Sequence, residues 1–463
     1  MKLLYSCIPF NTMPFCTSLP GHNPRYWDLV ESLDVTGRSH ELLARHVKNN
    51  VELLGILYTP ETDLERYGNV SSLISTYNLK LYHRHTERQL LLDKRHVFIR
   101  GYENGTVTIV KKLQEYASSG IRGYTQAVER WLSQRPHSID DPAKEDALKQ
   151  LFSQSRVALI YGAAGTGKST MVDHIAQYFN DKNKLILAHT NTAVDNLKRK
   201  VSAQNSEFRT ISSQIYRIVS DSEYDLLIMD ECSTVSNADL IKVLEKTSFK
   251  LLVLVGDVYQ IESIKFGNWF GMIRSFIPAT SVYELETPFR TRNNSLLDFW
   301  SKVRSLDDDI VEVMARNGYS AVLDNTLVET MDQDEIILCL NYDGLYGINN
   351  INRFLQSSNP SAAVSWRVCT YKIGDPILFS ETERFRQVIY SNLKGRIVDI
   401  ECDSDWIQFD VELDRALSEF DVAFVPDLEW IDRSTVLFKV YRNNASDEDD
   451  DSLNATGPFQ VAY

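Results

Sequence analysis

A glycine-rich segment, "YGAAGTGKST" at residues 161–170, constrains the fold of this chain more than any other feature. It follows the apolar run "VALIY" and opens the segment "KSTMVDHIAQYF", in which Met171, Ile175 and Tyr178 are spaced as on one face of a helix. Glycines between a strand and a helix let backbone N–H groups curl around an anion, and the helix N-terminus adds positive potential. The sequence therefore predicts a phosphate-binding loop at this junction.

Five short apolar runs predict the sheet that carries this loop. They alternate with longer amphipathic segments and read "VALIY" (157–161), "KLILAH" (184–189), "DLLIMD" (225–230), "KLLVLVGD" (250–257) and "SVYEL" (281–285). Runs that are apolar on both faces suit parallel strands covered by helices on both sides. We therefore predict an α/β fold built on a doubly wound parallel sheet.

The spacing within the glycine-rich segment is that of a P-loop, because Gly162 is followed after four residues by Gly167, Lys168 and Ser169. Lys168 is predicted to reach the β- and γ-phosphates of a nucleotide, and the Ser169 hydroxyl is predicted to bind Mg²⁺. The residues predicted to surround the nucleotide are Gly162, Ala163, Ala164, Gly165, Thr166, Gly167, Lys168, Ser169 and Thr170.

An acidic pair, Asp230 and Glu231, ends the apolar run "DLLIMD". Metal-assisted hydrolysis needs one carboxylate to hold the metal and its water shell, and another to orient and deprotonate the attacking water. Asp230 fits the first task and Glu231 the second. An acidic pair is also common at the start of a helix, which prefers negative charge. Together with the P-loop, the pair favours a Mg-ATP site.

Three further segments lie around the predicted site. "AHTNTAVDNLKRKV" at 188–201 follows the second strand, "VGDVYQIESIKFGNWF" at 255–270 ends another strand, and "LETPFRTRNNSLLDFW" at 285–300 follows the last one. In this order the segments resemble those of the superfamily 1 helicases, particularly the RecD-like, 5′-to-3′ branch. T-N-T-A-V-D-N-L is similar to motif Ia of that family, D-E to motif II, G-D-x-x-Q to motif III, and an arginine before Ser or Thr to motif IV.

This resemblance covers about residues 140–463 and implies a role for each matching residue. Gln260 would sense the γ-phosphate, and Arg290 would act as an arginine finger. Thr190, Asn191 and Thr192 would contact the backbone of a single strand. The basic run at 198–200, which begins with Lys198, suits phosphate contact or equally an ordinary solvated helix face. Trp269 and Phe270 suit stacking on bases, although core packing is the favoured interpretation.

The resemblance also implies a domain organisation. Residues 136–292 would form the first RecA-like motor domain, which binds ATP. Residues 293–463 would form a second, incomplete RecA-like domain with a strand at 336–340 and a small SH3-like β-barrel insert around 365–440. Residues 1–135 would form an accessory α+β domain, in which a hairpin is expected around Asn104-Gly105 within 96–110. His83 and His85 form an H-x-H pair there, without an evident cluster of carboxylate or cysteine partners.

The chain departs from the family in two places. Family members carry a glutamine upstream of the P-loop that reads adenine, whereas "DPAKEDALKQLF" at 141–152 offers only Gln150. In the family, a strand similar to "FQVAY" at 459–463 leads into motifs V and VI, and no H-K-x-Q-G occurs in the chain. We therefore expect the chain to be truncated before motif V.

Bulk composition limits the function further. Of the 463 residues, 43% are hydrophobic and 24% charged, as in an ordinary globular protein, and no apolar run approaches a membrane span. The six cysteines are scattered without a C-x-x-C, which favours a reducing cytoplasm. The net charge of −14 gives no global attraction to nucleic acid, so basic groups must be concentrated locally.

The leading functional prediction is an ATP-dependent helicase or translocase that uses Mg²⁺ and moves on single-stranded DNA or RNA. One alternative is a P-loop ATPase switch that does not unwind nucleic acid. Another is a fragment that binds ATP and nucleic acid with little turnover. The N-terminal region is also expected to be able to bind a protein partner.

Overall fold

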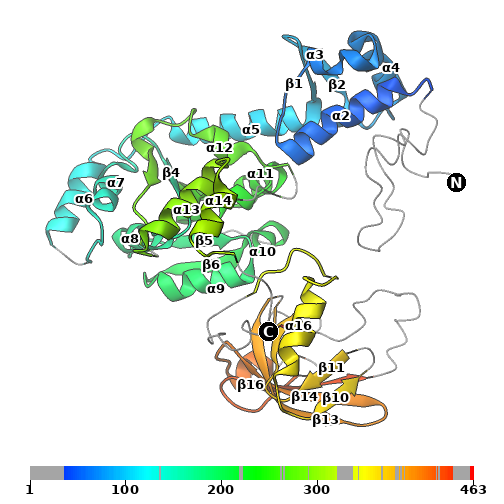
Figure 1. Ribbon diagram of the computed structural model, residues 1–463. Coiled ribbons are helices and arrows are strands. Elements are labelled where there is room, and N and C mark those ends of the chain that lie inside the picture. Colours follow the sequence, from blue (N-terminus) through cyan, green and yellow to red (C-terminus); the bar gives the residue numbers. More distant parts are fainter. Residues whose placement is uncertain are drawn as a thin grey trace. The chain divides into compact units, whose positions relative to one another are not determined.

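A computed structural model shows the chain as two compact units, Met1–Ile310 and Val311–Tyr463 (Figure 1). The first unit contains both the N-terminal region and the P-loop region. The structure describes residues 36–134, 137–217, 223–260, 263, 266–289, 291–320, 337–342, 344–366, 369–380, 385, 388–390, 392–423, 425, 428–441 and 459–462. No helix in these ranges is long and apolar enough to cross a membrane.

The N-terminal region is a helical layer on a small antiparallel sheet, whose strand order is β1-β3-β2. Its elements are α2 (Ser39–Leu54), β1 (Thr59–Pro60), α3 (Glu61–Leu64), η1 (Glu65–Tyr67), α4 (Val70–Lys80), η2 (Thr86–Arg88), β2 (Leu90–Asp93), β3 (His96–Ile99) and α5 (Arg100–Ala117). The apolar faces of α2 and α4 meet the sheet in one core, which includes Leu43, Val47, Ile74 and Val97.

The hairpin predicted around Asn104-Gly105 is wrong. The hairpin joins β2 to β3 instead, and it turns at Lys94 and Arg95, which both have positive φ. Asn104 and Gly105 lie inside α5. The β-branched residues of this segment suggested a strand, but its buried residues Thr106, Ile109, Leu113 and Ala117 follow helical spacing. Packing of that face therefore overrides the local turn signal.

Helix α5 joins the N-terminal region to the P-loop region, as its path in Figure 1 shows. Ile109, Leu113 and Ala117 belong to the core under one face of the parallel sheet. The buried side chain of Asn237 also donates a hydrogen bond to Thr106 Oγ1 at 3.0 Å. The two regions therefore share buried surface.

The predicted doubly wound parallel sheet is confirmed, with strand order β6-β5-β7-β8-β4-β9 and parallel pairing throughout. The strands are β4 (Val157–Gly162), β5 (Lys184–Ala188), β6 (Ser206–Thr210), β7 (Tyr224–Met229), β8 (Phe249–Gly256) and β9 (Val282–Leu285). Five of them are the predicted apolar runs, and the half-exposed β6 at the edge was not predicted.

Helices cover both faces of this sheet. They are α6 (Tyr124–Ser133), α7 (Pro142–Gln150), α8 (Lys168–Tyr178), α9 (Asn191–Lys200), α10 (Ile211–Tyr216), α11 (Asn237–Lys246) and α12 (Trp269–Ile273), with the short turns η3 (Cys232–Thr234) and η4 (Ala279–Ser281). Helices α13 (Asn294–Ser305) and α14 (Ile310–Arg316) follow β9 in the chain, and no described residue of either helix belongs to the hydrophobic cores of the sheet. The parallel sheet has one hydrophobic core on each face, and alternate side chains of β4 lie in the two cores. Leu159 packs with α5, α11 and α12, whereas Ile160 packs with α7, α8 and α9.

Two described residues that follow β8 in the chain, Phe266 and Asn268, contact the N-terminal region. Phe266 packs against Val51 and Leu57, and its ring lies 5.1 Å from that of Tyr102. Asn268 Nδ2 donates a hydrogen bond to the Gly55 carbonyl at 3.2 Å. The chain at these two residues is therefore attached to the end of α2.

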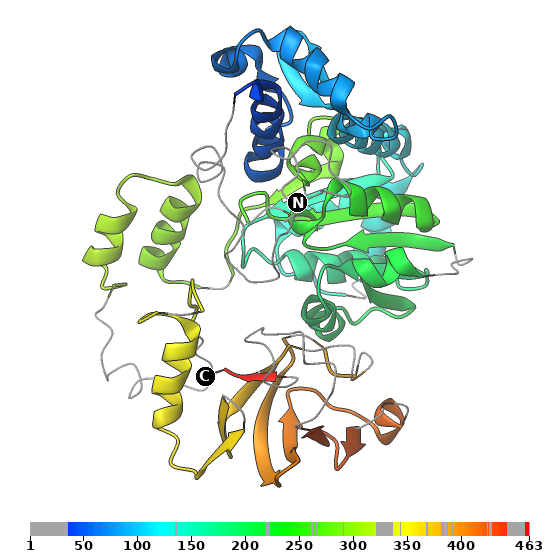
Figure 2. The same ribbon diagram turned by 90° about the vertical axis from the view of Figure 1, so that its right-hand side faces the viewer.

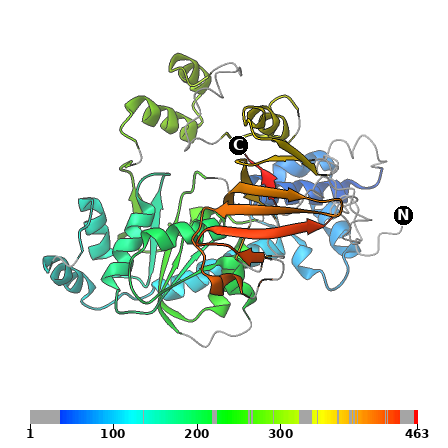
Figure 3. The same ribbon diagram turned by 90° about the horizontal axis from the view of Figure 1, so that it is seen from below.

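The second unit is mostly antiparallel. Its elements are α16 (Ile348–Ser357), β10 (Ala363–Trp366), β11 (Cys369–Lys372), β12 (Pro376–Phe379), β13 (Lys394–Cys402), β14 (Trp406–Leu413), α17 (Glu419–Val422), β15 (Leu428–Trp430), β16 (Thr435–Tyr441) and β17 (Phe459–Val461). Six strands form one sheet in the order β15-β16-β14-β13-β12-β17, seen side by side in Figure 3. Strand β17, red in Figure 2, pairs with β12.

An aromatic core holds this sheet together: the rings of Phe438 and Phe459 contact each other, and both contact Phe379 and Phe409. The predicted β-rich segment is therefore present. In the described residues β15 and β17 are the two edges of the sheet, so closure into a barrel stays a prediction. The strand predicted at 336–340 is wrong over residues 337–340, where Leu338 and Leu340 are 86% and 100% exposed.

Candidate nucleotide and nucleic-acid site

The predicted P-loop lies between β4 and α8, with the geometry that an anion site needs. Gly165 and Gly167 have φ of +85° and +81°, a backbone region that suits glycine. Gly167 is the residue that caps the N-terminus of α8. Within the loop, Thr166 Oγ1 donates a hydrogen bond to the Ala163 carbonyl at 2.9 Å. The backbone is therefore shaped to receive a phosphate at a helix N-terminus.

Lys168 is folded back onto the loop. Its Nζ donates hydrogen bonds to the carbonyl oxygens of Gly162, at 2.7 Å, and Ala163, at 2.9 Å. Burial lowers the pKa of Lys168, and the charges of Asp257 and Asp230 oppose that shift. Two carboxylates that follow the neighbouring strands β8 and β7 thus favour the charged form of the P-loop lysine.

The acidic pair lies where β7 ends. Asp230 is 9% exposed, and its Oδ1 accepts a hydrogen bond from the Glu231 backbone N–H at 2.9 Å. Burial raises the pKa of Asp230. Burial also raises the pKa of Glu231, and the charge of Asp230 adds to this shift. Glu231 has φ of +56°, and such strain in a non-glycine residue is concentrated at functional sites.

Asp257 follows β8 and accepts a hydrogen bond from Arg304, a residue that the sequence analysis did not single out. Arg304 of α13 donates to Asp257 Oδ1 at 3.3 Å, and its guanidinium lies 4.1 Å from the centre of the Tyr259 ring. Gln260 is exposed, and its backbone N–H donates to the Asp257 carbonyl at 3.2 Å. Arg290, the predicted arginine finger, lies outside the described residues.

Lys144 of α7 is a second residue that the sequence did not single out. It is fully buried, and its Nζ lies 2.6 Å from Asp140 Oδ2 and 4.5 Å from the centre of the Phe289 ring. A Cβ placed on Gly167 would lie 2.5 Å from this ammonium group. Lys144 is therefore the residue of the segment 141–152 that abuts the P-loop, whereas Gln150 lies at the C-terminus of α7.

Two signals in the sequence indicate the burial of Lys144. Asp141 caps α7 by accepting from the Ala143 N–H, and Pro142 is the first helical residue, so the helix begins there. Lys144 then shares the face of Ala147 and Leu148 at helical spacing.

Replacing Gly167 by alanine should weaken nucleotide binding at least about 10-fold, because the residue has positive φ and its added Cβ meets Lys144. Titration with a fluorescent ATP analogue measures this effect. Gly271→Ala is the matched control, since Gly271 lies in α12 and has no neighbour within 4 Å of an added Cβ. Equal affinities of the two variants would contradict the geometry described above.

The predicted strand-contacting residues lie on α9, which follows β5 in the same sheet. Thr190, Asn191, Thr192 and Lys198 are all exposed. The Thr190 hydroxyl caps the helix by accepting from the Ala193 N–H at 3.1 Å. Lys198 Nζ lies 3.7 Å from Asp195 Oδ1.

Trp269 and Phe270 are core residues, with exposed fractions of 1% and 2%. The indole N–H of Trp269 donates to the Val235 carbonyl at 2.8 Å. Stacking of these rings on bases is therefore excluded in this conformation, and the favoured interpretation is confirmed.

A protein-family model described as an AAA domain matches residues 141–324. The matched stretch is less than half of the chain. No curated protein sequence matches the chain. The matched stretch includes the P-loop, the acidic pair and Asp257, which lie together in the structure.

Solved structures with similarity to the chain include helicases. Pif1 from Bacteroides bound to ssDNA is 13% identical, with 70% of this chain and 82% of that chain covered and a TM-score of 0.41. Pif1 helicase from Candida albicans is 17% identical over 66% and 79% of the two chains, with a TM-score of 0.39. The UvsW helicase from bacteriophage T4 is 13% identical over 42% and 81%, with a TM-score of 0.28.

Proposed function

We propose that the chain is an ATP-dependent helicase or translocase of superfamily 1, which couples Mg-ATP hydrolysis to movement on single-stranded DNA or RNA. One observation carries this proposal. Lys168, the acidic pair and Asp257 meet at the carboxyl edge of three neighbouring strands, and α9 begins at the same edge from the next strand, β5. Hydrolysis and strand contact would therefore occur on one rigid sheet.

The residues present fit Mg-ATP. A hydroxyl, from Ser169, and a buried carboxylate, from Asp230, are the oxygen donors that Mg²⁺ prefers. The bound ion would neutralise charge on the β- and γ-phosphates. Lys168 would exchange its bonds to the loop carbonyls for phosphate oxygens. The raised pKa of Glu231 would favour its acceptance of a proton from the attacking water.

Gln260 and Arg290 retain their proposed roles as γ-phosphate sensor and arginine finger. Arg304 already places a guanidinium beside Asp257, which lies close enough to Lys168 to shift its pKa. We propose that Arg304 holds Asp257 in position while nucleotide is bound. The four cysteines described as free, Cys232, Cys339, Cys369 and Cys402, suit a reducing cytoplasm.

Measuring ATP hydrolysis with and without single-stranded DNA and RNA tests the proposal. We expect turnover that a single strand stimulates, together with separation of a forked duplex. Turnover without such stimulation would instead support an ATPase switch. Nucleotide binding without turnover would support a binding module.

Replacing Lys198 by glutamate should raise the DNA concentration for half-maximal stimulation about 10-fold, because it reverses one charge at a phosphate contact. Lys182→Glu is the matched control. Both lysines are 49% exposed and lie near an aspartate, but Lys182 precedes β5 at the opposite edge of the sheet. Equal effects of the two substitutions would contradict an interface on α9.

A further inference from the structure

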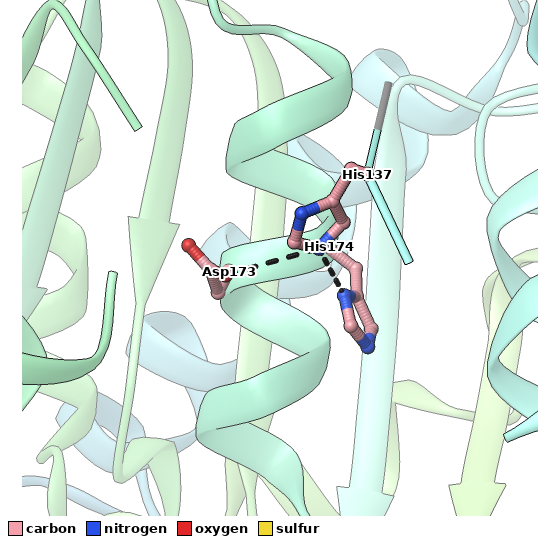
Figure 4. Close-up of side chains that lie close together, drawn as sticks. All are labelled: His137, Asp173 and His174. Carbon is pink, nitrogen blue, oxygen red and sulfur yellow. Dashed lines mark hydrogen bonds and ion pairs between the residues drawn. The ribbon is translucent and has the colours of Figure 1, made fainter. Parts of the chain in front are cut away.

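Three potential metal ligands lie close together at the side of α8, the helix that follows the P-loop (Figure 4). Asp173 and His174 belong to α8, and His137 belongs to the segment that precedes α7. One ligand atom from each residue lies within 4.8 Å of the other two. These residues contribute nothing to the Mg-ATP site proposed above.

The separations are close to those of a tetrahedral site. His137 Nε2 lies 2.8 Å from His174 Nδ1 and 3.9 Å from Asp173 Oδ2. Ligand atoms about 2.0–2.1 Å from a tetrahedral Zn²⁺ ion are about 3.3 Å apart. The two imidazoles therefore need to separate by about half an ångström, and the carboxylate needs to approach by a similar amount.

Asp140 prepares His174 for this role. His174 Nε2 lies 2.8 Å from Asp140 Oδ1, so in the neutral ring Nε2 carries the proton and donates it to the carboxylate. The lone pair of Nδ1 then faces His137. A carboxylate that accepts from the other ring nitrogen is the usual support of a metal-bound histidine.

The site combines a buried ligand with an accessible one. The side chains of His174, Asp173 and His137 are 3%, 13% and 22% exposed, respectively. His137 also lines a surface cavity of about 600 Å³ beside α6 and α7. An ion therefore has an entry path to ligands that are partly shielded from water.

We propose that His137, Asp173 and His174 bind a divalent transition-metal ion of the Zn²⁺ class, with water as a further ligand. Two imidazoles select such an ion over Mg²⁺, which prefers oxygen donors. The ion connects the segment before α7 to α8. The proposed metal site is also connected to the P-loop. Asp140, which accepts from His174, accepts a second hydrogen bond from Lys144, and Lys144 abuts Gly167.

Calorimetric titration of the full chain with ZnCl₂, in excess Mg²⁺, tests this site independently of ATP turnover. We expect one tight site per chain and a rise in the melting temperature when Zn²⁺ is present. His137→Ala should weaken binding at least 10-fold and abolish the rise, as loss of a ligand requires. Wild-type protein that binds no Zn²⁺ would overturn the proposal.

The double variant His83→Ala/His85→Ala is the control. His83 and His85 follow Tyr82 in the sequence, their ring centres lie 4.3 and 5.4 Å from that of Tyr82, and they are outside the metal-ligand group. We expect this variant to bind Zn²⁺ like the wild type. If it loses the tight site while His137→Ala retains it, the assignment is wrong.

Asp173→Asn keeps the inference testable should His137→Ala fold poorly. Asp173 Oδ1 accepts a hydrogen bond from the Ser202 backbone N–H at 2.9 Å, which an amide oxygen retains. The substitution removes one charged ligand, so Zn²⁺ affinity should fall at least 10-fold with an unchanged melting temperature in chelator. Unchanged affinity would overturn the proposed ligand set.

Discussion

Replacing Lys168 by methionine should reduce ATP turnover by roughly 100- to 1,000-fold, because the substitution removes the charged donor that we propose binds the transferred phosphate. The side chain is already held at the loop by two carbonyl oxygens, so little rearrangement is needed when phosphate arrives. Steady-state hydrolysis measured with a coupled phosphate assay checks this expectation.

Lys184→Met is the matched control. Lys184 is also fully buried, and its Nζ donates to the carbonyl oxygens of Phe179, at 2.8 Å, and Lys182, at 2.7 Å. It lies at the start of β5, at the edge of the sheet opposite the P-loop. The control should lose stability yet keep its turnover per folded molecule. Turnover that falls equally in both variants would remove Lys168 from its proposed role.

Replacing Trp269 by alanine should lower the free energy of unfolding by about 3–5 kcal/mol, the usual cost of deleting a buried aromatic side chain. The indole fills the core between α12 and the parallel sheet, where its ring centre lies 5.4 Å from that of Phe270. The substitution also leaves the Val235 carbonyl without its 2.8 Å hydrogen bond. Urea unfolding followed by circular dichroism measures the change.

Tyr216→Ala provides the comparison, because Tyr216 is 76% exposed and its removal should change stability by less than about 0.5 kcal/mol. A normally stable Trp269→Ala variant that lost only its affinity for single-stranded DNA would contradict the core assignment. That outcome would favour base stacking by Trp269 instead.

Five of the six strands of the parallel sheet were predictable because each of the five is a short, mostly apolar run. The P-loop was predictable because its residues are adjacent in the chain. Strand β6 was missed because "SEFRT" lies at the edge of the sheet and has one apolar residue, Phe208, among two polar and two charged ones, so no apolar run marks it. The hairpin error at Asn104-Gly105 has the opposite cause, since a strong turn signal lies inside a helix stabilised by tertiary contacts.

Lys144 and Arg304 were missed for another reason. Each lies beside a residue that is distant in the sequence: Lys144 is next to Gly167, and Arg304 donates a hydrogen bond to Asp257. Sequence patterns report local periodicity and contiguous motifs, whereas contacts of this kind depend on how helices cross the sheet. The cluster around His137 is similar, because His137 and His174 are 37 residues apart.

The contact between Asn268 and Gly55 joins the chain that follows β8 to the N-terminal region. Asn268 lies eleven residues after Asp257, whose charge acts on the P-loop lysine, and it donates to the residue that ends α2. Phe266 adds an apolar anchor to the same place. These two contacts hold the end of α2 to the P-loop region, which is one physical reason why the N-terminal and P-loop regions form a single compact unit.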